Sequence, residues 1–268
     1  MPEAEKIAFV FPHQDDEMFI FHRVRHLLKR GKRLSMIWIS DGAANSAEVR
    51  TSPTIRLLFP ILAHESDETI RLVRKAESVS LMRAIGVGDG NLHFLGYPSG
   101  QIMHHFHPIV ESLRRLFVEL APDEIYTVAY DQSEFEHDAC NAAVKSASRG
   151  LRQDVTLFEF PVFNNYRGIL RFHWLVPWRE VRTERTPFTA EEEGERLRLF
   201  RSVFKSQRSV AWLERLGSLL PSDYRKLGEP YRRMPEHDYA RPTHGARVMY
   251  VPRRLRFDHF RRLVSGYV

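Results

Sequence analysis

IAFVFPHQDDE, residues 7–17, joins a run of five apolar residues to one imidazole and three carboxylates. A short apolar run of this kind is typical of a buried parallel strand. His13 would then lie just beyond the carboxyl end of that strand, where open α/β sheets place their ligand sites. Asp15, Asp16 and Glu17 would repel one another unless a cation drew them together, because neighbouring like charges disfavour full ionisation. The stretch therefore predicts a divalent metal site, with an acidic helix start as the alternative explanation.

The composition is that of an ordinary globular protein. The chain has 268 residues, of which 43% are hydrophobic and 28% are charged, enough to bury a substantial core. Its one cysteine, Cys140, excludes an internal disulfide and a thiolate-rich zinc site, and is compatible with a reducing cytosol. Residues 1–6 lack the apolar core of a secretory signal, and no stretch has the roughly 20 apolar residues that span a bilayer. We therefore expect a cytoplasmic protein without a membrane span.

The chain carries an excess of positive charge. Its formal net charge is +6, its pI is near 9.5, and residues 241–268 hold seven arginines beside one acidic residue, Asp258. Such an excess attracts anionic substrates or surfaces. The arginines are scattered, and no helix-turn-helix, zinc-finger or RNA-binding signature accompanies them. We therefore do not expect nucleic acid as the partner, and keep a basic nucleic-acid-binding protein as the third hypothesis.

Short apolar runs alternate with segments of helical period in the first half of the chain. Strands are predicted over residues 7–11, 34–40, 92–95, 124–129 and 156–160. Helices are predicted to begin near Glu17, Ser66, Gln101, His137 and Thr189. The alternation predicts an α/β fold with a mostly parallel sheet covered by helices on both faces. We expect one domain over residues 1–268, with a core to about residue 165 and a C-terminal extension over about 166–268, in which residues 228–245 form an ordered loop.

A third metal ligand is expected from another strand end, because catalytic zinc keeps three protein ligands and one open position. His137 is the candidate, since it ends the sequence EFEH, residues 134–137, just after the predicted strand 124–129. Its side chain would then reach the same sheet edge as His13 and Asp16.

Another histidine pair is less suited to a metal. His22 and His26 have the i,i+4 spacing of a helical metal pair, but Arg23 stands where a zinc-protease motif needs a glutamate. We expect both histidines on the surface.

Further motifs extend the metal-site pattern along the chain. They are HQDDE (residues 13–17), DG (41–42), an Arg-x-x-Glu helix at Arg74 and Glu77 with a glycine turn at Gly86, LGYP (95–98), HDACN (137–141), KSQ (205–207) and DYARPTH (238–244). In these motifs the chain resembles the LmbE-like, or PIG-L, family of zinc-dependent de-N-acetylases. The resemblance implies a Rossmann-like three-layer sandwich with a C-terminal extension.

The resemblance also implies the roles of the site residues. Zinc would be held by His13, Asp16 and His137. Asp15 would act as general base on water that the metal activates. The expected substrate-binding residues are Arg74, Asp41 and His244, with an ion pair to Glu77 as the alternative role of Arg74. Two histidines and one carboxylate also suit other divalent ions, such as Fe²⁺.

The segment EFEH, residues 134–137, departs from the family pattern His-x-Asp-His but keeps its last histidine. Glu134 stands where the family has a histidine associated with stabilising the intermediate or protonating the leaving amine. Glu134 would serve as the acid only if burial or neighbouring carboxylates raised its pKa. Otherwise His244, His237 or Asp15 would donate the proton.

The leading hypothesis is a zinc-dependent hydrolase that removes the acetyl group from an N-acetylated amino sugar or sugar conjugate of the GlcNAc type. A noncatalytic carbohydrate- or anion-binding protein of the same fold is the second hypothesis. The expected partner is a small sugar-like molecule, and the oligomeric state, a homo-oligomer included, stays open.

Overall fold

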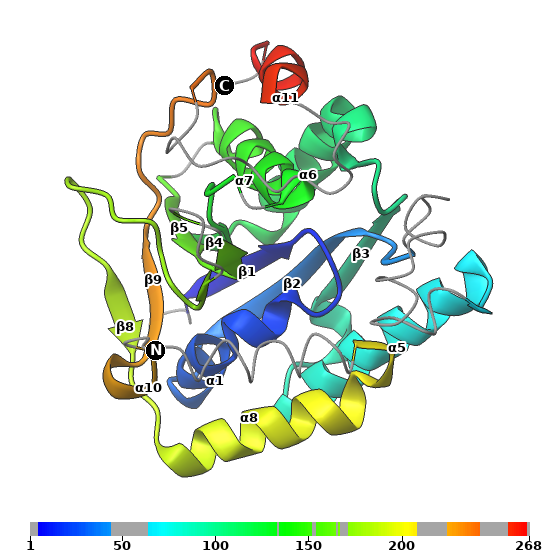
Figure 1. Cartoon of the computed structure of the whole chain (residues 1–268), viewed down its shortest axis with the longest axis vertical. Coiled ribbons are helices and arrows are strands. Elements are labelled where there is room, and N and C mark those ends of the chain that lie inside the picture. Colours follow the sequence, from blue (N-terminus) through cyan, green and yellow to red (C-terminus); the bar gives the residue numbers. More distant parts are fainter. Residues whose placement is uncertain are drawn as a thin grey trace.

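Seven strands form one sheet that helices cover on both sides (Figure 1). The computed structural model describes residues 5–43, 64–132, 134–151, 154–164, 166, 171–207, 224–241 and 257–266. Within these residues the architecture is the mostly parallel, three-layer α/β arrangement that the alternating sequence pattern predicts.

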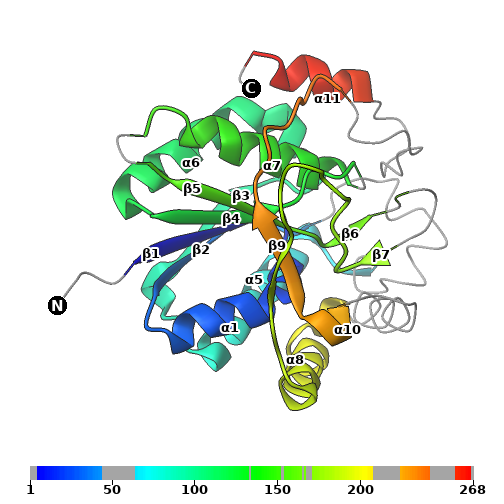
Figure 2. The same ribbon diagram turned by 90° about the vertical axis from the view of Figure 1, so that its left-hand side faces the viewer.

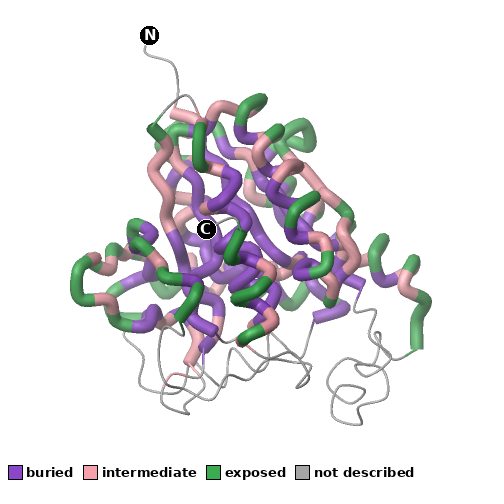
Figure 3. The backbone as a smooth tube through the Cα atoms, turned by 90° about the horizontal axis from the view of Figure 1, so that it is seen from above, coloured by how far each residue is buried: buried purple, intermediate pink, exposed green. Residues whose placement is uncertain are grey.

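Five parallel strands make up the centre of the sheet, in the order β3-β2-β1-β4-β5. They are β1 (Lys6–Phe11), β2 (Arg33–Ser40), β3 (Leu92–Tyr97), β4 (Glu124–Val128) and β5 (Thr156–Phe160). All five predicted strands are thus confirmed. Residues 7–11 are each at most 1% exposed, because helices cover the central sheet on both faces (Figure 1). Figure 3 shows the buried backbone segments gathered in the interior of the molecule. An uninterrupted apolar run, rather than an alternating one, fits such a strand.

Helices lie in two layers on either side of the sheet (Figure 1). One layer holds α1 (Phe21–Lys29), α5 (Asp67–Ile85) and α8 (Ala190–Val203), and the other holds α6 (Phe106–Leu120), α7 (Phe135–Ser148) and α11 (Phe257–Val264). In the part of the chain that the structure describes, no helix has both the length and the apolar composition needed to cross a membrane.

Two predicted helix starts are confirmed by their caps. The side-chain oxygens of Ser66 and Thr189 accept the N–H groups of Thr69 at 3.1 Å and of Glu192 at 3.2 Å. These bonds satisfy backbone donors that lack a partner at a helix start. Caps of this kind depend only on residues three positions apart, so the sequence alone reveals them.

The other helix starts are shifted. A 3-10 turn over Asp16–Phe19 precedes α1, and a second one over Ile102–His105 precedes α6. Helix α7 begins at Phe135 rather than at the predicted His137, because Glu134 is its N-cap and accepts the N–H of His137 at 2.8 Å.

The prediction of a loop over residues 228–245 is wrong in its first part. Residues Glu229–Arg233 form β9, which pairs antiparallel with β5 and with β8 (Glu184–Thr186) (Figure 2). The segment EPYRR lacks an apolar alternation, so its strand character comes from its partners in the sheet. Both strands lie in the predicted C-terminal extension yet continue the central sheet, and the division near residue 165 stays a prediction.

The predicted surface position of His22 is also wrong. His22 is 4% exposed, and its Nε2 lies 2.9 Å from Oε2 of Glu193 on α8. Its ring stacks on Phe188 with a centroid separation of 4.0 Å. The histidine is buried because α8 packs over α1, a contact between segments far apart in the sequence.

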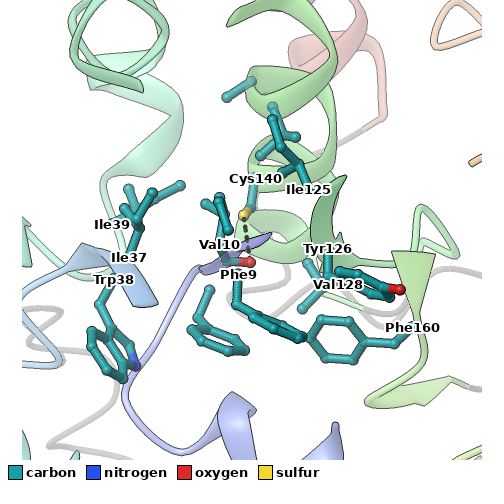
Figure 4. Packing of buried hydrophobic residues seen from close by; sticks show 14 of the residues in the cluster. Phe9, Val10, Ile37, Trp38, Ile39, Ile125, Tyr126, Val128, Cys140 and Phe160 are labelled. Carbon is teal, nitrogen blue, oxygen red and sulfur yellow. Dashed lines mark hydrogen bonds between the residues drawn. The ribbon is translucent and has the colours of Figure 1, made fainter. Parts of the chain in front are cut away.

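Aromatic and aliphatic side chains fill the space between sheet and helices (Figure 4). Phe9 stacks on Tyr126 at 4.9 Å, and the thiol of Cys140 lies 4.0 Å from the carbonyl oxygen of Val10. Burial raises the pKa of Cys140, so the thiol stays protonated at neutral pH. Cys140 is therefore a packed core residue and not a nucleophile.

A buried ion cluster joins β9 to β5. Glu159 accepts hydrogen bonds from Nε of Arg232 at 2.8 Å and from Nδ2 of Asn141 at 3.1 Å, and its Oε2 lies 2.7 Å from Nε2 of His237. Burial would raise the pKa of Glu159, but the charges and hydrogen bonds of His237 and Arg232 outweigh it and lower the pKa to about 2. The carboxylate thus stays ionised and links the last strands to the parallel sheet.

We predict that Glu159→Gln lowers the free energy of unfolding at pH 7 by roughly 3–5 kcal/mol, because it leaves the buried Arg232 without its counter-charge. The folded-state pKa of Glu159 is depressed, so its stabilisation is complete above the unfolded-state pKa and is lost as the pH falls toward 2. Urea denaturation should therefore show that the difference in the free energy of unfolding between wild type and variant becomes smaller from pH 5 to pH 3. The control is Glu180→Gln, at an exposed position. A difference in the free energy of unfolding that does not change with pH would contradict the stabilising role of the ionised Glu159.

Candidate functional site

The turn after β1 carries the acidic residues of the predicted site. It begins at His13, whose backbone N–H donates to Oδ2 of Asp16 at 3.0 Å. Asp15 adopts φ 135° and ψ −22°, a conformation that residues other than glycine rarely adopt. Such strain costs about 1–3 kcal/mol and persists only where surrounding contacts hold it. The conformation of this turn therefore depends on bonds to the rest of the protein.

Glu17 supplies those bonds. Its carboxylate accepts the N–H of Asp15 at 2.8 Å, the indole N–H of Trp38 at 3.1 Å and the hydroxyl of Ser78 at 2.5 Å. The side chain is 1% exposed, and burial raises its pKa to about 7. Because both oxygens are engaged in this way, Glu17 anchors the turn and lies outside the group of candidate metal ligands.

Helix α7 brings the second motif to the same sheet edge. Strand β4 lies next to β1, so His137, in the first turn of the helix that follows β4, comes to lie beside His13 and Asp16. One ligand atom from each of these three residues lies within 4.8 Å of the other two. The chain runs outward from β1 to β2 and β3 and then returns to β4, so the cluster lies where the strand order reverses. Open α/β sheets bind their ligands at this point.

The two histidines approach Asp16 through different ring nitrogens. Nδ1 of His13 lies 3.4 Å from Oδ2 of Asp16, and Nε2 of His137 lies 3.5 Å from Oδ1. The ring centroids of the histidines are 5.4 Å apart. The three side chains thus surround one point with two nitrogens and a carboxylate.

Glu136 orients His13. Its Oε2 lies 2.7 Å from Nε2 of His13, and its carboxylate also accepts the backbone N–H groups of Gly100 at 3.0 Å and Ile102 at 2.9 Å. The bond to Nε2 leaves Nδ1 directed at Asp16, as outer carboxylates commonly orient metal-binding histidines. Sequence reasoning did not single out Glu136, although its place directly before a candidate ligand in EFEH was a signal.

The acidic residues around the cluster differ in their pKa values. Burial, with the charge of Asp16 added, raises the pKa of Asp15 to about 8. Burial also raises the pKa of Glu134 to about 8. Burial would raise the pKa of Glu136 too, but its bonds to His13 and to the backbone lower it. These neighbouring carboxyl groups cannot all be ionised at neutral pH unless a cation lies among them, as we expected from the sequence.

The histidines differ in the same way. Burial lowers the pKa of His137 to about 4, so its imidazole is neutral at pH 7, the form that binds metals. Burial would also lower the pKa of His13, but the hydrogen bonds and charges of Asp16 and Glu136 raise it well above its usual value. Without a metal, the protonated His13 thus provides positive charge next to Asp16 and Glu136. A bound cation would provide that charge instead.

Asp41 ties together two backbone segments at the edge of the site. Its Oδ1 accepts the N–H groups of Ala43 at 3.0 Å and Ser99 at 3.1 Å, and its Oδ2 accepts Nε of Arg71 at 2.6 Å. Gly42 has φ +74°, and a Cβ there would lie 2.3 Å from Oε1 of Gln14. Glycine is thus required at residue 42, because the backbone there passes close to the side chain of Gln14.

Arg74 lies beside Asp15 rather than in an ion pair with Glu77. Its charge acts to lower the pKa of Asp15, and its Nε is buried without a hydrogen-bond partner in the described part of the chain. Glu77 instead accepts the N–H and the hydroxyl of Ser206 at 2.8 and 2.5 Å. His244 lies outside the described residues, so its substrate-binding role stays a prediction.

Solved structures of several other proteins share the fold. A deacetylase of the teicoplanin biosynthesis pathway is 15% identical in a match that covers 87% of this chain and 100% of that chain, with a TM-score of 0.62. N,N'-diacetylchitobiose deacetylase from Pyrococcus horikoshii is 15% identical over 87% of this chain and 85% of its own, with a TM-score of 0.59. The 4-carboxy-2-hydroxymuconate hydratase from Pseudomonas putida KT2440 is 10% identical over 87% and 98%, with a TM-score of 0.55. No curated protein sequence is significantly similar to this chain.

The family model of GlcNAc-PI de-N-acetylase, PIG-L, matches residues 8–148. The match covers more than half of the chain and runs from β1 to the end of α7, so it contains both motifs that supply the candidate metal ligands. The chain therefore belongs to the GlcNAc-PI de-N-acetylase (PIG-L) family.

Proposed function

We propose that the protein is a metal-dependent hydrolase that removes the acetyl group from an N-acetylated amino sugar or sugar conjugate of the GlcNAc type. The observation that carries the proposal is the convergence of His13, Asp16 and His137 within 4.8 Å of one another, inside the family domain. The shared fold alone does not select the reaction, because it hosts two deacetylases and a hydratase. The reaction therefore depends on the side chains of the site.

The donor set fits a divalent metal. Two imidazole nitrogens and one carboxylate are the ligands of many catalytic zinc sites, and such sites keep a position open for water or substrate. The same donors accept Fe²⁺, so zinc is the first ion to test and not the only one. When bound, the metal would lower the pKa of water and polarise the amide carbonyl.

Asp15 is the proposed general base. It precedes the candidate ligand Asp16, and its carboxyl group interacts electrostatically with Asp16, His13 and Arg74. Asp15 does not belong to the group of three candidate ligands, which supports a role as base rather than as ligand. From there its carboxylate would take a proton from the attacking water. Arg74, whose charge acts on Asp15, would bind a polar or anionic part of the substrate.

Glu134 is the proposed proton donor to the leaving amine. Its Oε2 lies 3.9 Å from Nε2 of His137, so the carboxyl group adjoins the cluster. His237, an alternative donor, is unsuited because its side chain is 0% exposed and bonded to Glu159. A carboxylic acid in place of the family's histidine would make the same proton transfer.

We predict that His137→Ala loses the metal. Elemental mass spectrometry on protein prepared without a histidine tag should find about one equivalent of zinc in the wild type and little in the variant, because only two ligands remain. His26→Ala, on α1 and away from the cluster, is the matched control and should keep its metal. Equal metal in His137→Ala and wild type, or none in the wild type after incubation with Zn²⁺, would refute the cluster.

We predict that Asp15→Asn keeps the metal while acetate release falls by about 10²–10⁴-fold, the contribution of a general base. Acetate would be measured with N-acetylglucosamine conjugates as substrates, in parallel with metal content. Loss of metal in this variant would overturn the separation of base from ligand. Calorimetric binding of the conjugates without acetate release by the wild type would favour the noncatalytic binding protein.

A further inference from the structure

A hollow of about 410 Å³ opens at Gln14, in the turn after β1 that carries two of the candidate ligands, and is within the size range of small-molecule sites. Its lining includes Gln14, Ser40, Asp41, Arg71, Lys75 and Phe94. A Cβ on Gly42 would lie 2.3 Å from Oε1 of Gln14 and 2.7 Å from Cδ of Arg74, so this end of the hollow is close to Arg74. The charge of Arg74 acts in turn on Asp15, the proposed base. None of these lining residues has a role in the proposed chemistry, although the family resemblance led us to expect Asp41 to bind substrate.

Two buried polar atoms of this lining are unsatisfied in the described part of the chain. They are Oε1 of Gln14 and Oγ of Ser40, whose residues are 1% and 0% exposed. Nε2 of Gln14 donates to the carbonyl of Ser40 at 2.8 Å, which fixes the amide and leaves its oxygen as an open acceptor. Buried polar groups are nearly always hydrogen-bonded, so an orphaned acceptor and an orphaned hydroxyl together indicate a polar ligand.

Positive charge gathers on the same side of α5. Arg71, Arg74 and Lys75 stand at i, i+3 and i+4, a spacing at which like charges repel. Asp41 neutralises Arg71, and Arg74 lies beside Asp15. The ammonium of Lys75 has no carboxylate partner among the described residues and lies 5.0 Å from the ring centroid of Phe94. One uncompensated positive charge thus borders a hollow that has unsatisfied hydrogen-bonding groups.

We propose that this hollow binds an anionic group of the substrate, a carboxylate or a phosphate, so that the protein acts on an acidic N-acetylated amino sugar. The inference rests on the proposed function, which supplies the reaction. The hollow supplies the reason why the substrate should be acidic. Lys75 pairs with the anion, and the hydroxyl of Ser40 donates to it. Oε1 of Gln14 accepts a sugar hydroxyl.

The test compares the binding of three probes by calorimetry: neutral N-acetylglucosamine, N-acetylglucosamine 1-phosphate and N-acetylmuramic acid. The wild type should bind at least one acidic probe about tenfold more tightly than the neutral one, a preference that 0.5 M salt weakens. A preference for only one acid supports the proposal and identifies the anion. Equal binding of all three probes, or no binding of any, overturns it.

Matched variants locate the effect. Lys75→Gln should reduce the preference to about threefold or less, and Lys75→Arg should restore it because the charge returns. Arg83→Gln removes one charge from the exposed end of the same helix, outside the hollow, and should leave the preference intact. A preference that survives Lys75→Gln overturns the assignment of the anion to this hollow.

Acetate release from the same three probes separates this inference from the proposed function. Tight binding of an acidic probe without acetate release retains the anion site and contradicts the hydrolase. Acetate release with the same kcat/KM for neutral and acidic probes retains the hydrolase and overturns the anion site.

Discussion

The buried carboxylate of Glu17 is the constraint on which the site depends. The turn after β1 has to place Asp16 between two histidines from different motifs, and it does so with Asp15 in an unfavourable backbone conformation. Glu17 offsets that cost with three hydrogen bonds, to the turn itself, to Trp38 on β2 and to Ser78 on α5. The position of the candidate ligand is therefore fixed to the sheet and to a helix at once.

Residues beyond the matched family domain brace the same turn. Nη1 of Arg196 on α8 donates to the carbonyl of Met18 at 3.1 Å, and Nε2 of Gln207 lies 3.5 Å from the carbonyl of Gln14. Ser206 joins Glu77 on α5. Arg196 and Gln207 thus help to fix the turn that carries the candidate ligands through its backbone carbonyls, and the KSQ motif at residues 205–207 has a physical role.

Two glutamates in one helical turn occupy different chemical states. Glu136 accepts hydrogen bonds from a histidine and two backbone amides, and its pKa is lowered in spite of burial. Glu134 accepts one backbone N–H, and burial raises its pKa to about 8. When their surroundings push the pKa values of two neighbouring carboxyl groups apart, one stays ionised while the other can hold a proton and act as an acid. The EFEH segment therefore provides both a fixed carboxylate and a protonatable one.

The sequence by itself determined what depends on neighbours along the chain. The strand over residues 156–160 and the caps at Ser66 and Thr189 follow from local patterns. The candidate ligands His13, Asp16 and His137 were predicted to lie together because strand ends meet at one sheet edge, and the structure brings them within 4.8 Å of one another. Tertiary structure alone decided β9, the burial of His22 and the bond between Glu136 and His13. Each of these needs a partner that is distant in sequence, such as Glu159 for Arg232, and the pairing energy appears only once the fold has brought the two segments together.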